Sequence, residues 1–259
     1  QVELTDVPED EDAPVLLHNN AFSAPTEGVV ESFGLPAKGE VDPTGVMAFF
    51  YYFLFGLMLG DAAYGLLMVI GCAFALKKYP NMGSGIKKML QMFLYCGIST
   101  TFWGVMFGSY FGDAVTVISE TFFHRAVTIP ALWFEPLDDP MKLLMFSFLF
   151  GIIHLFTGLG VKGYMLLKAR QVMDFFCSVV LWYMLLIGLI LMLLPSEMFA
   201  SMAGVSLVFP GWLSELAKWM AIIGAVGIVL MSARDKKNIA VRLALGAYDL
   251  YGASSWLSD

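Results

Sequence analysis

Long apolar runs alternate with short polar connections along this chain, and the pattern predicts membrane-spanning helices. The runs cover residues 46–76, 89–111, 141–167, 172–194 and 212–231. A helix needs about 20 apolar residues to cross a hydrocarbon core about 30 Å thick. Because the runs are apolar all round, they exclude the alternating strands of a membrane barrel. The expected fold class is therefore all-α, a polytopic α-helical membrane protein.

The first run is too long for one ordinary span, since at about 1.5 Å per residue it would reach about 45 Å. Its middle contains a carboxylate, Asp61, in the stretch FGLMLGDAAYGLL, residues 55–67. Two alternatives fit this run. It forms one strongly tilted helix, or it forms a hairpin of two short helices that breaks between Gly60 and Gly65.

Composition and charge support the membrane assignment and suggest an orientation. Hydrophobic residues make up 58% of the chain and charged residues 14%, against about a quarter charged in a soluble domain. Eleven of the fifteen basic residues lie in three connections: Lys77, Lys78, Lys87 and Lys88; Lys162, Lys168 and Arg170; Arg234, Lys236, Lys237 and Arg242. By the positive-inside rule these connections face the cytoplasm. A multi-pass protein of the cell membrane is expected.

The two ends of the chain are more polar. Residues 1–45 are acidic and contain five prolines, so they predict a segment that is extended, docked on something else or partly disordered. Because the chain starts with Gln1 and no signal-peptide pattern, it is expected to be a piece of a longer protein. Residues 233–259 have apolar positions at a helical spacing, which predicts an interfacial amphipathic helix or the entry to another span.

Asp61 is the most unusual polar residue within the spans. A charge at the centre of a bilayer costs about 3 kcal/mol or more, so such residues usually mark ion routes or partner contacts. The alternative is a helix-break residue, whose carboxylate accepts hydrogen bonds from backbone groups freed at the turn. The sequence leaves both interpretations open.

A short pattern, G-x-M-x-G, occurs twice, as FGLMLG (55–60) and WGVMFG (103–108), and an aspartate follows each copy, Asp61 and Asp113. Small residues spaced by four on a helix let two helices approach closely. The glycines predicted to pack helices are Gly56, Gly60, Gly65, Gly104, Gly108 and Gly112.

His154 is a second polar residue within an apolar run. It could relay a proton, but a hydrogen bond to a neighbouring helix is the more ordinary role. Because no other histidine or cysteine lies near it in the sequence, no metal site is expected. The chain also lacks a phosphate-binding glycine loop and the hydrolase motifs, so neither a cofactor nor a catalytic centre of its own is expected.

Three stretches together resemble a known family. The segments VLLHNNAFSAPTEGVVESFGLPAKGEVDPT (15–44), FGLMLGDAAYGLL and GISTTFWGVMFGSYFGD (97–113) closely resemble the a-subunit, or subunit I, of V-type ATPases, with the bacterial and archaeal branch nearest. The resemblance implies a membrane stator subunit beside a rotating ring of proteolipid subunits, which contributes to proton translocation. It also implies peripheral-stalk and central-stalk partners and surrounding membrane lipid, and no nucleic-acid partner.

The resemblance also implies a cytoplasmic amino-terminal side and therefore the hairpin, with Asp61 toward the far side of the membrane. Six spans are then expected, at about 46–60, 62–77, 88–111, 140–167, 171–194 and 212–232. Candidates for lining a half-channel, or for a structural polar role, are Asp61, Tyr64, Asp113, Glu120 and His154. The essential arginine of the family would follow the terminal Ser258-Asp259, and no arginine present is expected to take its role.

Two other functions stay open from the sequence. A secondary transporter would place its substrate site at a broken helix such as the first run. A pure assembly scaffold would use the same helices without lining an ion path.

Overall fold

The computed structural model describes residues 15–37, 40–125, 127–204, 206–231 and 238–258, and every regular element in these ranges is a helix. The chain divides into two compact units, residues 1–139 and 140–259. Unit 1 contains η1 (Ala24–Thr26), α1 (Glu27–Phe33), α2 (Thr44–Leu59), α3 (Ala62–Lys78), α4 (Ser84–Phe107) and α5 (Ala114–Phe123). Unit 2 contains α6 (Pro140–Lys168), α7 (Val172–Phe175), η2 (Phe176–Val180), α8 (Leu181–Leu193), α9 (Glu197–Ala203), α10 (Gly211–Met231) and α11 (Ile239–Ser258).

Four helical segments in the described ranges are long and apolar enough to cross a membrane. They are Ser84–Phe107, Pro140–Lys168, Val172–Leu193 and Gly211–Met231. The third of these consists of α7, η2 and α8 in sequence, and its η2 part is a turn of π-helix. Together with the exposed apolar side chains of these helices, this makes the chain an all-α, multi-pass membrane protein.

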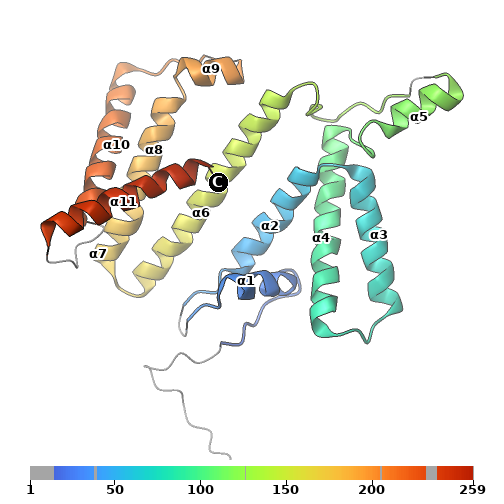
Figure 1. Cartoon of the computed structure of the whole chain (residues 1–259), viewed down its shortest axis with the longest axis horizontal. Coiled ribbons are helices and arrows are strands. Elements are labelled where there is room, and N and C mark those ends of the chain that lie inside the picture. The colour runs from blue at the N-terminus through green and yellow to red at the C-terminus, as the bar shows by residue number, and fades with distance from the viewer. Residues whose placement is uncertain (1–14, 38–39, 126, 205, 232–237, 259) are drawn as a thin grey trace, which may run out of the picture. The chain divides into compact units, whose positions relative to one another are not determined.

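The apolar run at residues 46–76 forms two helices rather than one. α2 has 16 residues and α3 has 17, and they join at Gly60 and Asp61. Gly60 has φ of +49°, a left-handed conformation that ends α2. α4 lies between the two helices and packs against both, as Figure 1 shows. The two arms are therefore held together by α4.

Close approach of α4 to its neighbours depends on glycine. A Cβ added at Gly56 would lie 2.2 Å from Ser99 Oγ, and one at Gly65 would lie 2.4 Å from the Thr101 nitrogen. Real Cβ atoms essentially never come within 3.0 Å of such neighbours. Ser99 and Thr101 belong to α4, so both arms meet this helix almost backbone to backbone.

The amino-terminal segment differs from the extended linker expected from composition. Residues 24–33 form η1 and α1, and η1 packs against α2 and α4. The Phe22 ring lies between Tyr52 of α2 and Tyr95 of α4, at centroid distances of 5.1 and 5.6 Å, and Tyr52 donates a hydrogen bond to the Phe22 carbonyl. The acidic composition gave no sign of these contacts of Phe22. The prediction of an extended chain is wrong for these residues, which form helices.

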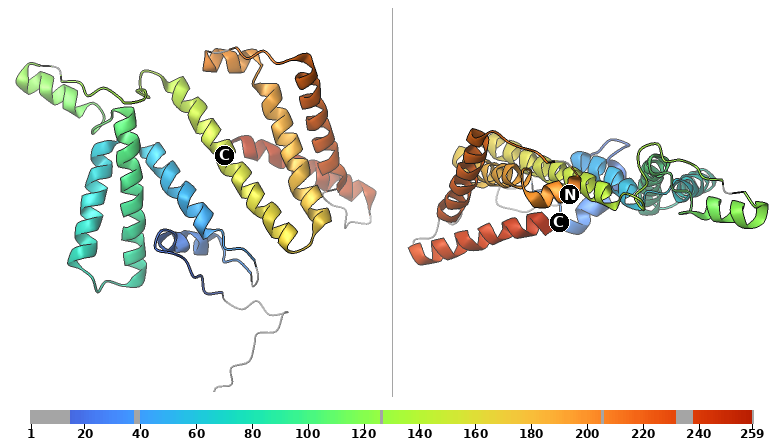
Figure 2. Two further views of the ribbon diagram at one scale, coloured as in Figure 1. Left: turned by 180° about the vertical axis from the view of Figure 1, so that it is seen from behind. Right: turned by 90° about the horizontal axis from the view of Figure 1, so that it is seen from above.

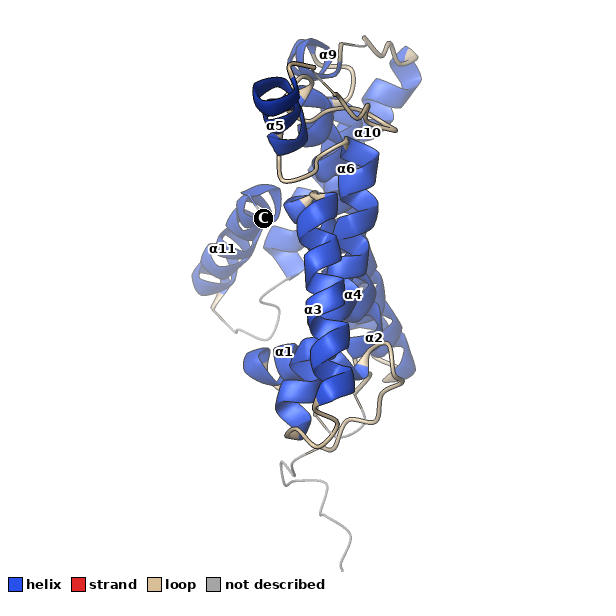
Figure 3. Ribbon diagram, turned by 90° about the vertical axis from the view of Figure 1, so that its right-hand side faces the viewer, coloured by secondary structure: helices blue, strands red, loops and turns tan. Residues whose placement is uncertain are grey.

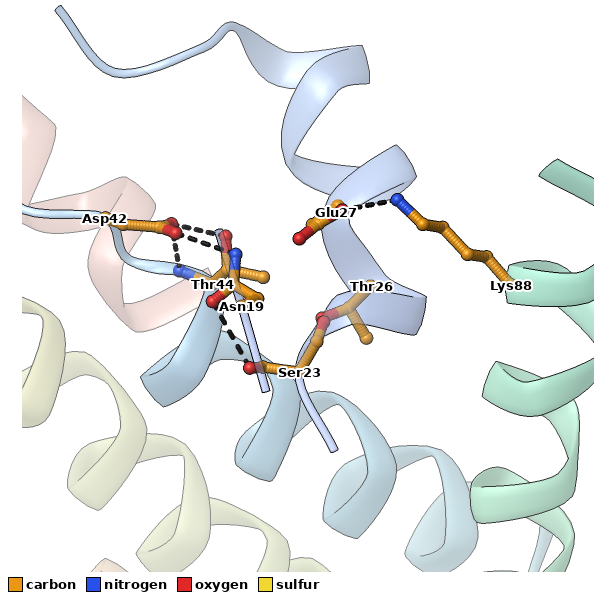
Figure 4. A network of polar contacts seen from close by, with 7 residues as sticks. All are labelled: Asn19, Ser23, Thr26, Glu27, Asp42, Thr44 and Lys88. Atoms are coloured by element: carbon orange, nitrogen blue, oxygen red, sulfur yellow. Dashed lines mark hydrogen bonds and ion pairs between the residues drawn. The ribbon is translucent and has the colours of Figure 1, made fainter. Parts of the chain in front are cut away.

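Polar contacts close the same segment into a loop, drawn in Figure 4. The Asp42 carboxylate accepts hydrogen bonds from Asn19 Nδ2, Thr44 N and Thr44 Oγ1. Burial acts to raise the pKa of Asp42, but the hydrogen bonds from Thr44 and Asn19 outweigh it and hold the pKa below its usual value. Asn19 and Thr44 thus share one acceptor, which joins the start of the segment to the start of α2.

An ion pair ties α1 to α4. The Glu27 carboxylate, with a side chain only 9% exposed, pairs with Lys88 Nζ, whose side chain is 43% exposed. Figure 4 shows the lysine reaching across from its own helix to the glutamate. Removing one partner of a buried pair is costly because the other charge stays buried without compensation.

The ion pair gives a double-mutant test. We expect Lys88→Met to lower the free energy of unfolding by about 1–2 kcal/mol, less than for a fully buried pair because the lysine is partly exposed. In a Glu27→Gln background, Lys88→Met should cost clearly less. Denaturation of the purified protein in detergent measures all four free energies. The neighbouring exposed lysine supplies the control, since Lys87→Met should change stability by no more than about 0.5 kcal/mol. Equal costs for Lys88→Met in both backgrounds would contradict a coupled pair.

Candidate functional site

Asp61 lies at the junction of three helices and is 6% exposed. It is the N-cap of α3, with extended φ and ψ of −129° and 119°. Its Oδ1 accepts hydrogen bonds from Ala63 N at 2.9 Å and Tyr64 N at 3.0 Å. These are two of the backbone donors that the first turn of a helix leaves unpaired.

The second carboxylate oxygen of Asp61 binds the segment that follows α4. Oδ2 accepts hydrogen bonds from Ser109 Oγ and Gly112 N, both at 2.8 Å. In the opposite direction, Ala62 N donates to the Ser109 carbonyl at 2.9 Å. We call this group of contacts among Asp61, Ala62, Ser109 and Gly112 the Asp61 junction. Four donors on one carboxylate favour its charged form, and they account for the aspartate as a helix-break residue.

The repeated G-x-M-x-G pattern has one structural meaning in both copies. Gly60 and Gly108 each adopt a left-handed conformation and donate to the carbonyl four residues earlier, Gly56 and Gly104. The second glycine of each copy therefore ends a helix. The first glycine of each copy lies at a close contact, and a Cβ at Gly104 would be 1.9 Å from Ala62 N.

Gly108 and Gly112 do not lie inside a helix, in contrast to their predicted role. A Cβ at Gly108 would meet the backbone of Ala131 at 2.9 Å, whereas nothing lies within 4 Å of one at Gly112. Gly112 has φ of +68°, which brings its N–H to Asp61. The helix-packing prediction is thus wrong for Gly112, because α4 ends at Phe107 and the chain turns there.

Three other predicted polar candidates belong to unit 1 but take no part in the Asp61 junction through their side chains. Tyr64 is 52% exposed, and its ring packs edge-on against Phe111 at 4.9 Å. Asp113 is the exposed N-cap of α5 and has no side-chain capping hydrogen bond. Glu120 is exposed on α5. In the described part of this region, the Asp61 carboxylate accepts hydrogen bonds from Ala63 N, Tyr64 N, Ser109 Oγ and Gly112 N, and not from these three side chains.

His154 lies in unit 2, on α6, and lines a cavity of about 690 Å³. The cavity is bounded by α6, η2, α8, α10 and α11. Its polar lining includes Lys162, Ser178 and Asp249 as well as His154. Within the described parts of the chain, no three His, Cys, Asp or Glu side chains come together as a group that could hold a metal ion.

Comparison with known proteins identifies the family. Residues 2–128 match the V-type ATPase 116 kDa subunit family. The chain is 30% identical over 276 residues to an A-type ATP synthase subunit I of Methanocaldococcus jannaschii, covering 97% of this chain and 38% of that protein. The chain thus matches the V-type ATPase subunit I family over its first half and subunit I relatives over nearly its whole length.

Two further relatives, one archaeal and one bacterial, are similar to this chain. It is 29% identical to an A-type ATP synthase subunit I of Pyrococcus horikoshii, over 96% of this chain and 34% of the relative. It is 30% identical to a V-type ATP synthase subunit I of Chlamydia trachomatis, over 42% of this chain and 17% of the relative. The chain therefore spans about a third of the length of the archaeal relatives that it matches almost throughout.

In unit 2, α8 and α10 meet closely at small residues, a contact that the sequence analysis did not predict. A Cβ at Gly188 of α8 would lie 2.7 Å from the Ala221 nitrogen of α10, and one at Gly224 would lie 2.7 Å from the Leu185 nitrogen. Ala217 is fully buried at the same interface. The spacing of Ala217 and Ala221, four residues apart, was the available signal, since small residues at that spacing let helices pack closely.

The π-helical turn η2 was also missed. Residues 176–180 are apolar or small and carry no proline or glycine, so nothing in their pattern distinguishes them from ordinary helix. A π turn adds a residue to the helical period and rotates the following side chains relative to the preceding ones. It places Cys177 and Ser178 among the residues that line the cavity.

Substitutions at Asp61 separate its two sets of hydrogen bonds. Asp61→Ser keeps an acceptor for the first turn of α3 but cannot reach Ser109 and Gly112. We expect a loss of about 2–3 kcal/mol in the free energy of unfolding, because two charge-assisted hydrogen bonds are lost. Asp61→Ala also removes the cap and should cost about 1 kcal/mol more. Denaturation in detergent measures both losses, and equal stability of Ala, Ser and Asp at this position would refute the junction.

The glycine contacts predict opposite results on one helix. Gly65→Ala places a methyl group against the backbone of Thr101 and should destabilise the protein by about 1–3 kcal/mol. Gly71→Ala, six residues along the same helix with nothing within 4 Å, should be neutral or stabilise by about 0.5–1 kcal/mol through helix propensity. Thermal unfolding of both variants in detergent compares them. A destabilising Gly71→Ala or a neutral Gly65→Ala would be the opposite of what the packing predicts.

Proposed function

We propose that this chain is part of the membrane domain of the stator subunit of a rotary V/A-type ATPase and that it contributes to proton translocation beside a proteolipid ring. The observation that carries the proposal is the alignment of 96–97% of the chain with subunit I of archaeal A-type ATP synthases. The all-helical membrane fold is consistent with it. ATP would be hydrolysed or made by other subunits, so this chain is not itself the catalyst.

The proposed topology has six crossings, formed by α2, α3, α4, α6, the continuous α7–α8 segment and α10. α2 and α3, at about 24–26 Å each, would be the short arms of a hairpin. The connections rich in lysine and arginine would face the cytoplasm, which leaves the Asp61 junction toward the opposite side. α11, with Arg242 near its start, would lie at the cytoplasmic interface.

We propose a structural role for Asp61 rather than a proton-carrying one. Its carboxylate already accepts hydrogen bonds from four protein donors, two of them at the start of α3. A proton carrier must take up and release a proton in each cycle, and protonation here would weaken all four contacts at once. The role fits a hairpin that has to keep its shape beside a moving ring.

The same contacts weigh against a secondary transporter. Broken helices in transporters offer the unpaired N–H groups of a half-helix to an anionic substrate. In this chain the N–H groups of Ala63 and Tyr64 at the start of α3 already donate to the Asp61 carboxylate. A substrate anion would have to displace that carboxylate, so the break does not offer a ready site.

The complete ATPase in proteoliposomes tests the proposal. ATP-driven proton uptake, followed by a pH-sensitive dye, should require the full-length subunit. Complexes that assemble with Asp61→Ser should retain most of their proton uptake per assembled complex, because the variant removes a structural tie and no proton carrier. ATP hydrolysis and subunit composition of the same preparation are the controls.

Three results would count against the proposal. Fully assembled Asp61→Ser complexes that hydrolyse ATP but take up no protons would make Asp61 part of the pathway. Solute flux by the full-length subunit, reconstituted without proteolipid or ATPase partners, would favour a transporter. Normal proton uptake by an assembled complex that lacks these helices would show that they are needed neither for the proton path nor for assembly.

A further inference from the structure

We propose that the cavity of unit 2 is a binding site for a phosphate-bearing membrane lipid. This cavity, defined by His154, Lys162, Ser178, Trp182, Tyr248 and Asp249 among others, has a volume of about 690 Å³. Ligand sites commonly have volumes of about 300–1,000 Å³. The proposal depends on the membrane fold of unit 2 and does not require the stator function.

Along α6 the charged residue of the lining lies nearest the end of the helix. Lys162 lies six residues, or about 9 Å, from the basic end of the helix at Lys168. Leu159 and Leu155 lie successively deeper, and His154 lies deeper still. Lys162 and the two leucines follow the order of a lipid, with a charged headgroup at the membrane surface and apolar chains further in.

Lys162 supplies the charge for a phosphate. Its side chain is exposed, and within the described ranges it forms no ion pair with a carboxylate. A lysine that lines a pocket between membrane helices offers its charge to a phosphate headgroup. Ser178 and Tyr248 place hydroxyl groups in the same lining, and Asp249 can accept hydrogen bonds from headgroup hydroxyls.

α11 forms one wall of the cavity. Figure 2 shows this helix lying along one side of the other helices of unit 2. It is fixed to α10 by Arg242, whose Nε donates to the Leu230 carbonyl at 2.8 Å, and by Gly246, which meets the backbone of Val229. Tyr248 and Tyr251 of the lining are 72% and 70% exposed. Aromatic side chains with a polar tip are typical of the headgroup region.

Two glycines in the lining face open space. Nothing in the protein lies within 4 Å of a Cβ built at Gly158 of α6 or Gly252 of α11. A larger side chain at either position would extend into open space beside the cavity without meeting the protein backbone. Gly151, on the same helix as Gly158 but outside the lining, has the same open surroundings and is a matched control.

Photo-crosslinking of the full-length subunit within its complex tests the site. The probe is a phosphatidylglycerol with a diazirine in its acyl chain, offered in phosphatidylcholine nanodiscs, and mass spectrometry locates the labelled residues. We expect labelling of the α6, η2 and α8 lining, which unlabelled phosphatidylglycerol displaces. Lys162→Met should reduce the labelling about tenfold, the loss expected for one charge-assisted contact. Gly158→Leu should abolish it by filling the space.

The controls decide between a site and general lipid contact. Lys168→Met and Gly151→Leu should leave the labelling of the lining close to that of the unmodified protein. Labelling spread evenly over all helices, or unchanged by both Lys162→Met and Gly158→Leu, would overturn the proposal. Displacement of the probe by inorganic phosphate alone would show a site for a soluble anion instead of a lipid. If Gly158→Leu does not fold, Lys162→Met with its Lys168→Met control still decides the question.

Discussion

The fold of unit 1 depends on one carboxylate with two hydrogen-bonding directions. Asp61 caps α3 through one oxygen and binds Ser109 and Gly112 through the other, so residues about fifty positions apart share one acceptor. Helix ends that are buried away from water must find partners for their backbone groups within the protein. A buried aspartate meets this need for two chain turns at once. Figure 3 shows the result, with α3 and α4 running side by side below the turns.

The junction can form only because α4 comes unusually close to its neighbours. Glycine at 56, 65 and 104 removes the side chains that would separate the backbones, and Gly104 lies directly under the Asp61–Ala62 peptide. Without that approach Ser109 and Gly112 would not reach the carboxylate. The hydrogen bonds of Asp61 therefore depend on the close packing at the glycines. Van der Waals packing brings the backbones together, and the hydrogen bonds determine how the helices end.

The sequence predicted the parts of this fold that depend on composition and local chemistry. Apolar runs located the long helices, and the Gly60-Asp61 pair indicated where the first run breaks. The G-x-M-x-G pattern identified functionally equivalent positions, but their division into a packing glycine and a helix-ending glycine could not be predicted, since it depends on which neighbour lies above each one. The hydrogen-bonding partners of Asp61 could not be predicted for the same reason. Ser109 and Gly112 are distant in sequence, and their roles follow from the tertiary path of the chain.

Unit 2 shows the opposite use of small residues, and this contrast explains why it contains a cavity. At Gly188 and Gly224, α8 and α10 meet backbone to backbone, so almost no space remains between them. Gly158 and Gly252 instead face open space, and the π turn η2 directs Ser178 toward the same space. A helix bundle that packs tightly along one seam while leaving small residues at another has room for a further group there. In a membrane, lipid chains and headgroups are present at high local concentration, which is why a lipid is the proposed occupant.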